Sequence, residues 1–192
     1  MGYYRAGFDV IGVDIVAQKR YPFEFHQADA LAFVREHGHE FDVIHASPPC
    51  QRYSAMSSCR DRSVHADLIG ETRRSLVDTG RLWVIENVPG APLVDPIVLC
   101  GVMFGLKVYR HRLFESPCPL TAPGHVNHPE AVPRAGHGVS PGGYISVAGH
   151  TGNVRVARLA MGIEWMTGDE LSQAIPPAYT EHIGKQLMEA MR

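Results

Sequence analysis

A cysteine follows two prolines directly after a short apolar run, in the stretch ASPPCQRYS at residues 46–54. The preceding run, FDVIHA at 41–46, is typical of a short strand. Pro48 and Pro49 are expected to end that strand, because proline cannot continue a β-ladder and fixes φ. Cys50 is therefore predicted on a stiff loop at the carboxyl end of a strand, which is where open α/β sheets bind ligands. A thiol in that place is a candidate nucleophile.

Carboxylates are expected at the ends of two other strands. Asp14 lies near the end of the run FDVIGVDI at 8–15. A carboxylate after the first strand of a Rossmann-type fold commonly binds ribose hydroxyls, so Asp14 is a candidate ligand of an adenosine-containing cofactor. Glu86 lies near the end of the run RLWVIENV at 81–88, where it could hold or donate a proton beside Cys50.

Each of these residues also has an ordinary structural interpretation. A lone buried cysteine is more often a small core residue than a nucleophile. Asp14 could simply cap a helix, and two arginines further along, Arg110 and Arg112, could be solvated surface charges. Taken one at a time, these residues do not decide between the structural and the functional interpretation.

The apolar patterns predict the elements that position these side chains. Buried strands are predicted over 8–15, 41–46 and 81–88, and helices over 30–38 and 65–80. The first helix is expected to have Asp29 as its N-cap, and the two helices are expected to end at Gly38 and Gly80. Because strands and helices alternate with short connections, the pattern predicts an α/β fold. We expect a Rossmann-like, mostly parallel sheet with flanking helices.

The second half of the chain changes in character. Residues 116–150 are rich in proline, glycine and histidine with little periodicity, which predicts a loop or minimal subdomain. Helices are predicted over 154–166 and 178–192. We therefore expect a catalytic and cofactor-binding domain over 1–115, with the C-terminal residues 151–192 packing back on it.

Composition excludes several classes of protein. The chain has 192 residues, of which 45% are hydrophobic and 20% charged, as in an ordinary globular domain. No apolar run approaches the roughly 20 residues of a membrane span, and no signal peptide is expected. The net charge of −2 argues against indiscriminate coating of nucleic acid. Four cysteines without framework spacing favour a reducing, cytoplasmic location.

The histidine-rich segment contains candidate ligands for zinc. The candidate ligands there are Cys118, His125, His128 and His137. No pair among them has Cys-x-x-Cys or close histidine spacing, so no metal is expected. Cys59 and Cys100 are interpreted as structural.

Four short motifs follow one another along the chain: PPCQ (48–51), ENV (86–88), YRHRLF (109–114) and QAIPP (173–177). In order and spacing they resemble the cytosine-C5 DNA methyltransferases, in the compact form carried by phages or restriction–modification systems. The resemblance covers nearly the whole chain except 116–150. It implies a class I methyltransferase-like fold, S-adenosyl-L-methionine as cofactor and double-stranded DNA as substrate, in the cytoplasm of a bacterial host if the chain is phage-encoded.

The resemblance also implies catalytic roles. Cys50 would be the thiolate that attacks ring C6 of cytosine, and Glu86 the partner of ring N3. Because C6 lies inside the duplex stack, the base must first be extruded. Arg110 and Arg112 match the two arginines of the family's Gln-x-Arg-x-Arg motif, with Val108 in place of the glutamine. They could stabilise negative charge on the flipped base.

Further roles follow from the same resemblance. The residues expected to position the substrate are Pro49, Gln51, Ser54 and Asn87. For the cofactor, Asp14 would hold the ribose, Ile15 would pack on the adenine, and Asp29 would approach the adenine amino group. Pro48 is the fourth residue expected at the cofactor. The segment 116–150 would read the target sequence, with short or loose specificity because it is small.

The chain departs from the family pattern in two places. The family's first strand and glycine-rich loop have no counterpart before MGYYRAGF, which is expected to begin inside the following helix. The usual Gly-Asn of the last motif reads Ser172-Gln173. Without its first strand the sheet is expected to expose edges, which an upstream segment or a partner chain could complete.

Two other functions remain open. The first alternative is a truncated, non-catalytic protein that binds DNA or a partner. The second is a related transferase that acts on RNA or adds a different one-carbon group at C5.

Overall fold

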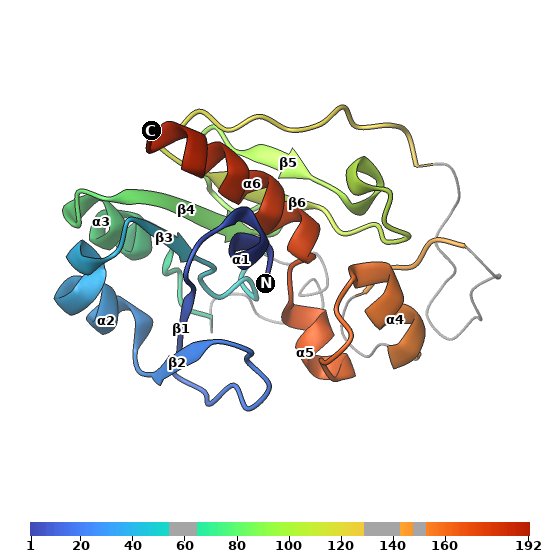
Figure 1. Cartoon of the computed structure of the whole chain (residues 1–192), viewed down its shortest axis with the longest axis horizontal. Coiled ribbons are helices and arrows are strands. Elements are labelled where there is room, and N and C mark those ends of the chain that lie inside the picture. The colour runs from blue at the N-terminus through green and yellow to red at the C-terminus, as the bar shows by residue number, and fades with distance from the viewer. Residues whose placement is uncertain (54–64, 129–142, 148–152) are drawn as a thin grey trace. The chain divides into compact units, whose positions relative to one another are not determined.

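The structure is a computed structural model that describes residues 1–53, 65–128, 143–147 and 153–192. The chain divides into two compact units. The first, here called the sheet unit, comprises Ile11–Val98 and Arg112–Thr121. The second, the helical unit, comprises Met1–Val10, Leu99–His111 and Ala122–Arg192. The predicted α/β fold with flanking helices is confirmed, and its strands form mixed sheets (Figure 1).

The strands form two separate sheets. In the first, β1 (Ile11–Asp14) pairs in parallel with β2 (Glu24–Gln27). The second has the order β3-β4-β6-β5, formed by β3 (Val43–Ala46), β4 (Leu82–Asn87), β6 (Arg112–Glu115) and β5 (Ile97–Leu99). The pairing of β3 with β4 is parallel, whereas β4 and β6 run antiparallel.

The prediction that all three N-terminal strands are buried is wrong for two of them. β4 is buried over almost its whole length, but the residues of β1 and β3 are exposed or only partly buried. Within the described part of the chain, β1 pairs only with β2 and β3 only with β4. Each therefore keeps one edge without a neighbouring strand, and the side chains beside that edge stay accessible to water.

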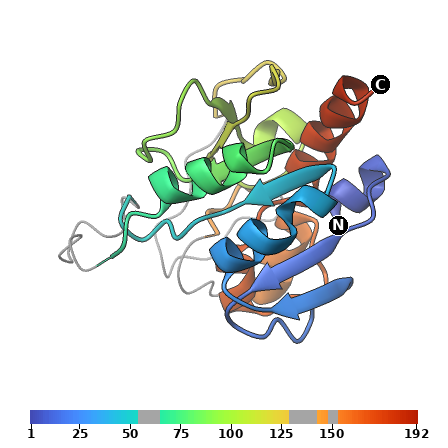
Figure 2. The ribbon, with the colours of Figure 1, turned by 90° about the vertical axis from the view of Figure 1, so that its left-hand side faces the viewer.

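Helices α2 (Ala30–His37) and α3 (Ile69–Asp78) flank the strands of the sheet unit. They contact each other, and Figure 2 shows α3 running alongside β3. The predicted N-cap is confirmed, because Asp29 Oδ1 accepts the Ala32 N–H at 2.8 Å. Gly38 follows α2 as predicted, and α3 ends two residues before Gly80, whose φ of 66° favours glycine.

The core of the sheet unit lies between α3 and one face of β4. Leu76 of α3 packs with Trp83 and Ile85, and Ile44 of β3 packs against the same cluster. Side chains two residues apart on a strand share a face, so Glu86 lies on the opposite face from Ile85. The core thus directs Glu86 away from α3.

The helical unit is built around two groups of helices. α1 (Gly2–Ala6) packs closely on α6 (Pro177–Ala190), where a Cβ at Gly2 would lie 2.0 Å from Thr180 Oγ1. α4 (Val154–Met161) and α5 (Gly168–Gln173) surround a second apolar cluster. That cluster includes Val108, Ile145, Val147, Ala157, Met161, Ile163 and Leu171.

The two C-terminal helices are confirmed, with one difference. The first ends at Met161 instead of 166, because Gly162 adopts a φ of 67° and terminates it. The short helix α5 was not predicted. Its signal is a capping box, in which Thr167 Oγ1 accepts the Glu170 N–H while Glu170 Oε2 accepts the Thr167 N–H.

Among the helices that the structure describes, none combines the length and the hydropathy required to cross a bilayer.

A partly buried ion pair joins α3 to β6. Arg73 Nε lies 2.5 Å from Glu115 Oε1, and Arg73 Nη2 lies 2.7 Å from Oε2. The Val94 N–H also donates to Glu115 Oε2, at 2.8 Å. Glu115 is only 4% exposed. The hydrogen bond with Glu115 raises the pKa of Arg73 above its ordinary value.

We expect Glu115→Gln to lower the free energy of unfolding by about 2 kcal/mol, because the partly buried Arg73 guanidinium loses its counter-charge. This is less than the full cost for a completely buried pair, since Arg73 keeps partial access to water. Urea unfolding of both proteins measures the difference. Glu181→Gln is the control, because Glu181 pairs with the exposed Lys185 at i,i+4, and should cost under about 0.5 kcal/mol. Equal losses for the two variants would contradict the prediction.

Candidate active site

The loop that carries Cys50 leaves the carboxyl end of β3, as predicted. Cys50 is a free cysteine of intermediate exposure, and its carbonyl accepts the Tyr53 N–H at 3.0 Å. Asn87, at the end of β4, donates from Nδ2 to the Pro48 carbonyl at 2.9 Å. Asn87 is 1% exposed, and its Oδ1 accepts the Val88 N–H at 2.9 Å. The cysteine loop is therefore tied to the end of the neighbouring strand.

Glu86 precedes Asn87 and forms the acidic part of the site. It is 7% exposed, and its Oε1 lies 2.9 Å from Arg112 Nε. In the antiparallel ladder Glu86 is directly opposite Phe114, so Arg112, two residues before Phe114, lies on the same face of the sheet. Burying an unpaired charge is costly, and Arg112 supplies the counter-charge that keeps the Glu86 carboxyl group in a fixed orientation.

His45 on β3 belongs to the same face and was missed in the sequence. His45 is opposite Val84 of β4, and Val84 lies two residues before Glu86. The ring centroid of His45 lies 6.4 Å from that of Phe114. Its Nε2 is 3.1 Å from Ser47 Oγ. Desolvation lowers the pKa of His45 to about 4, so the ring is neutral at pH 7 and adds no positive charge beside Glu86. A histidine inside an apolar strand run is the signal that could have identified it.

The sheet unit thus brings four predicted residues to the carboxyl ends of β3 and β4: Cys50, Pro48, Glu86 and Asn87. Arg112 joins them through its ion pair with Glu86. Pro49 and Gln51 are exposed on the cysteine loop. Ser54 lies outside the described residues.

Arg110 belongs to the helical unit, whereas these residues belong to the sheet unit. Its side chain is 4% exposed and donates hydrogen bonds to the carbonyls of Val147 and Ser172. Its own carbonyl accepts the Tyr179 hydroxyl at 2.7 Å. These contacts give Arg110 a structural function within its unit, and its catalytic role stays a prediction.

The predicted cofactor residues follow β1 and β2. Asp14 Oδ1 accepts the Val16 N–H at 2.8 Å, and Oδ2 accepts from Gln18 Nε2 at 3.1 Å. Asp14 therefore organises the turn after β1 and caps no helix. Ile15 and Val16 are 67% and 62% exposed. An ionised carboxylate accepts about four hydrogen bonds, so Asp14 retains capacity for hydroxyl groups beside this apolar surface.

Asp29 lies after β2 at the start of α2. Its Oδ1 is occupied by capping the helix, as described above. An approach to an adenine amino group would use the remaining acceptor capacity of the same carboxylate.

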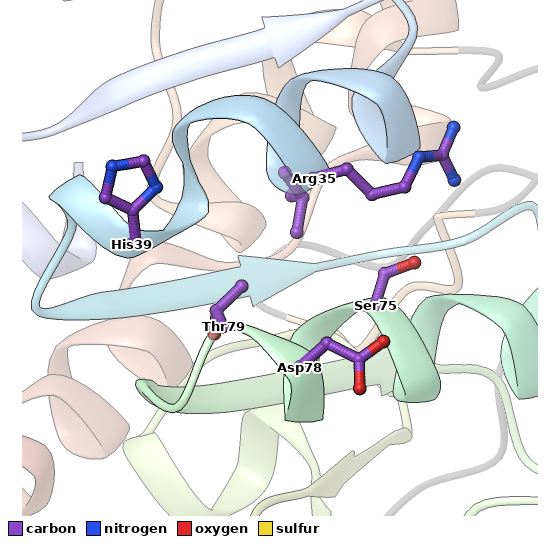
Figure 3. A pocket seen from close by; sticks show the side chains of 6 residues that line it. Arg35, His39, Ser75, Asp78 and Thr79 are labelled. Carbon is purple, nitrogen blue, oxygen red and sulfur yellow. The ribbon is translucent and has the colours of Figure 1, made fainter.

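A pocket between α2 and α3 is separate from this site (Figure 3). It is lined by Val34, Arg35, His39, Ser75, Asp78 and Thr79. His39 lies four residues before β3 and Thr79 three residues before β4, so the pocket lies at the amino ends of these strands. The cysteine loop lies at their carboxyl ends, and the pocket therefore contributes nothing to the candidate site.

No family model and no curated protein matches the chain. Among solved structures, the chain is similar to a protein encoded within an E. coli prophage and provisionally described as a DNA modification methyltransferase. The TM-score is 0.68 at 15% identity, and the alignment covers 99% of this chain and 95% of that chain. The chain thus has a methyltransferase-like α/β fold.

Proposed function

We propose that this chain is a DNA (cytosine-5-)methyltransferase that uses S-adenosyl-L-methionine as methyl donor and double-stranded DNA as substrate. The observation that carries the proposal is the hydrogen bond from Asn87 to the Pro48 carbonyl. It holds the Cys50 loop against the strand end that presents Glu86. A thiol and a carboxyl group supported by neighbouring strands are the two groups that activation of cytosine requires. The description of the prophage-encoded neighbour supports DNA as the substrate class.

The chemistry explains why both groups are needed. Cytosine C5 is too weakly nucleophilic to accept a methyl group directly. Cys50, as the thiolate, forms a C–S bond at C6 while Glu86 holds a proton at N3, and C5 then becomes enamine-like. Once C5 carries the methyl group, loss of the C5 proton and elimination of the C6 thiolate restore the aromatic ring and free Cys50. The base must be flipped out first, because C6 is inaccessible in the duplex.

The residues after β1 and β2 fit an adenosine-containing cofactor. The Asp14 carboxylate can accept hydrogen bonds from ribose hydroxyls, and the exposed Ile15 provides an apolar surface for the adenine. Asp29 would accept from the adenine amino group, and Pro48 would border the methyl donor. When bound, S-adenosyl-L-methionine supplies an electrophilic methyl group on a sulfonium.

The remaining residues would act by positioning. Arg112 orients the Glu86 carboxyl group, and Arg110 would stabilise negative charge on the base. Pro49, Gln51 and Ser54 would shape the loop around the flipped base. Residues 116–150 would contact the target sequence. The cytoplasm of a bacterial host, where DNA is accessible, is the proposed location.

One observation favours the non-catalytic alternative. Within the described residues, β1 and β3 each have one edge without a paired strand. An upstream segment or a partner chain could add a strand there by main-chain hydrogen bonding. In that case the chain alone would bind DNA or its partner but would bind the cofactor weakly.

Methyl transfer from labelled S-adenosyl-L-methionine to plasmid DNA tests the proposal. Digestion of the DNA to nucleosides should yield label in 5-methyldeoxycytidine. Label in a methylated adenine would refute the cytosine assignment, and label in an RNA substrate alone would establish the RNA alternative. Calorimetric titration of the cofactor gives an independent readout. Binding in the micromolar range supports the enzyme, whereas absence of binding together with DNA binding supports the non-catalytic protein.

A further inference from the structure

The helical unit contains four potential metal ligands outside the candidate active site. Cys100, His111, His125 and His128 each offer one ligand atom, and these atoms all lie within 4.8 Å of one another. Cys100 and His111 are the first and last residues of the segment 100–111, whereas His125 and His128 come from an irregular segment beyond β6. The spacing argument against a metal concerned Cys118, His125, His128 and His137. It does not apply here, because this set combines His125 and His128 with Cys100 and His111.

Two of the separations match those around a tetrahedral ion. His111 Nε2 and His125 Nε2 are 3.3 Å apart, and Cys100 Sγ and His128 Nε2 are 3.5 Å apart. Zinc bonds of about 2.0–2.1 Å to nitrogen and 2.3 Å to sulfur, at tetrahedral angles, give about 3.3 Å between two nitrogens and 3.6 Å between nitrogen and sulfur.

The ring positions agree with the same centre. The three imidazole centroids are mutually separated by 5.4, 5.0 and 5.3 Å. Three rings at nearly equal separation surround a common point. Rings that each coordinate one zinc ion through nitrogen would lie about 5 Å apart by the same geometry.

Neighbouring side chains hold two of the ligands in place. Cys100 is fully buried. Tyr109 stacks on His128, with ring centroids 3.9 Å apart and an interplanar angle of 4°. Tyr109 also stacks on Tyr144, with ring centroids 4.6 Å apart. Lys107 Nζ lies 4.5 Å from the Tyr144 ring centroid. Such outer contacts fix the orientation of a ligating ring.

We infer that Cys100, His111, His125 and His128 form a structural zinc site. One thiolate and three imidazoles complete a four-coordinate set of the kind that zinc prefers, with no position left for substrate. The ion would tie residues 122–128, which have no helix or strand, to the segment 99–111. Under the proposed function this would anchor one end of the target-recognition segment, but the zinc site itself does not depend on that function.

Metal analysis of the full chain, purified from zinc-supplemented medium, tests the inference. We expect about one zinc per wild-type chain by plasma mass spectrometry. Cys100→Ser and His125→Gln should each retain less than a fifth of that amount. Cys118→Ser is the matched control, because Cys118 is a buried cysteine of the sheet unit, and it should retain the full amount.

Cobalt titration of the chelator-treated wild-type chain gives a readout that does not require a variant to fold. Tetrahedral binding to a thiolate should produce a ligand-to-metal charge-transfer band and intense visible d–d bands. The melting temperature should rise on adding zinc to wild type and stay unchanged for His125→Gln. A wild-type chain that binds no more zinc or cobalt than Cys100→Ser, or a control that loses the metal equally, would overturn the inference.

Discussion

Replacement of Cys50 by alanine should reduce methyl transfer by at least about 1,000-fold, because the step that activates cytosine needs a nucleophile at C6. The fold should be unaffected. The loop is held through the Pro48 carbonyl and the turn at Tyr53, and neither contact involves the Cys50 thiol. The measurement is incorporation of label from S-adenosyl-L-methionine into DNA, with urea unfolding to verify that stability is unchanged.

Cys118→Ser is the control for this experiment, since Cys118 lies after β6 and has no assigned chemistry. It should keep the parent activity. Equal activity of Cys50→Ala and the parent would remove Cys50 from the mechanism. DNA that contains 5-fluorocytosine provides a direct test of the covalent step. Fluorine at C5 cannot leave as a proton, so the Cys50 adduct should persist and be detected as a protein–DNA species, absent from Cys50→Ala.

Glu86→Gln should lower the rate of methyl transfer by about 100- to 10,000-fold, the range for loss of a positioned acid–base group. It should also lower stability by about 2 kcal/mol, because the side chain of Arg112 loses the charge that compensates it in a largely buried position. Single-turnover labelling measures the first effect and urea unfolding the second. Glu36→Gln, at a side chain that is 78% exposed on α2, should change neither.

The catalytic and structural contributions of Glu86 can be separated with Arg112→Met. This variant should itself be destabilised, because it leaves the buried Glu86 carboxylate unpaired. The double variant Glu86→Gln/Arg112→Met removes both charges, and its stability should exceed the value expected from adding the two single losses. Its activity should stay as low as that of Glu86→Gln. Recovery of activity together with stability would show that Glu86 acts only as a structural partner of Arg112.

Local chemistry in the sequence determined much of the fold. The alternation of apolar runs predicted β1, α2, β3, α3 and β4 in their order, but not β2. Asp29 predicted the start of α2, and the prolines predicted that Cys50 lies beyond the end of β3. These features depend on backbone constraints and on groups only a few residues apart, so a linear pattern contains them. The roles assigned by resemblance to the site residues, including Cys50 and Glu86, remain predictions.

Only the tertiary structure decided which distant side chains meet. The antiparallel return of β6 alongside β4 places Arg112 against Glu86 and Glu115 against Arg73. Open edges were expected from the missing first strand, but the pairing of the strands decides that β1 and β3 have them. The same holds for Cys100 and the three histidines around it. Their ligand atoms lie within 4.8 Å of one another because of how the chain folds, and the spacing of these residues in the sequence does not predict this.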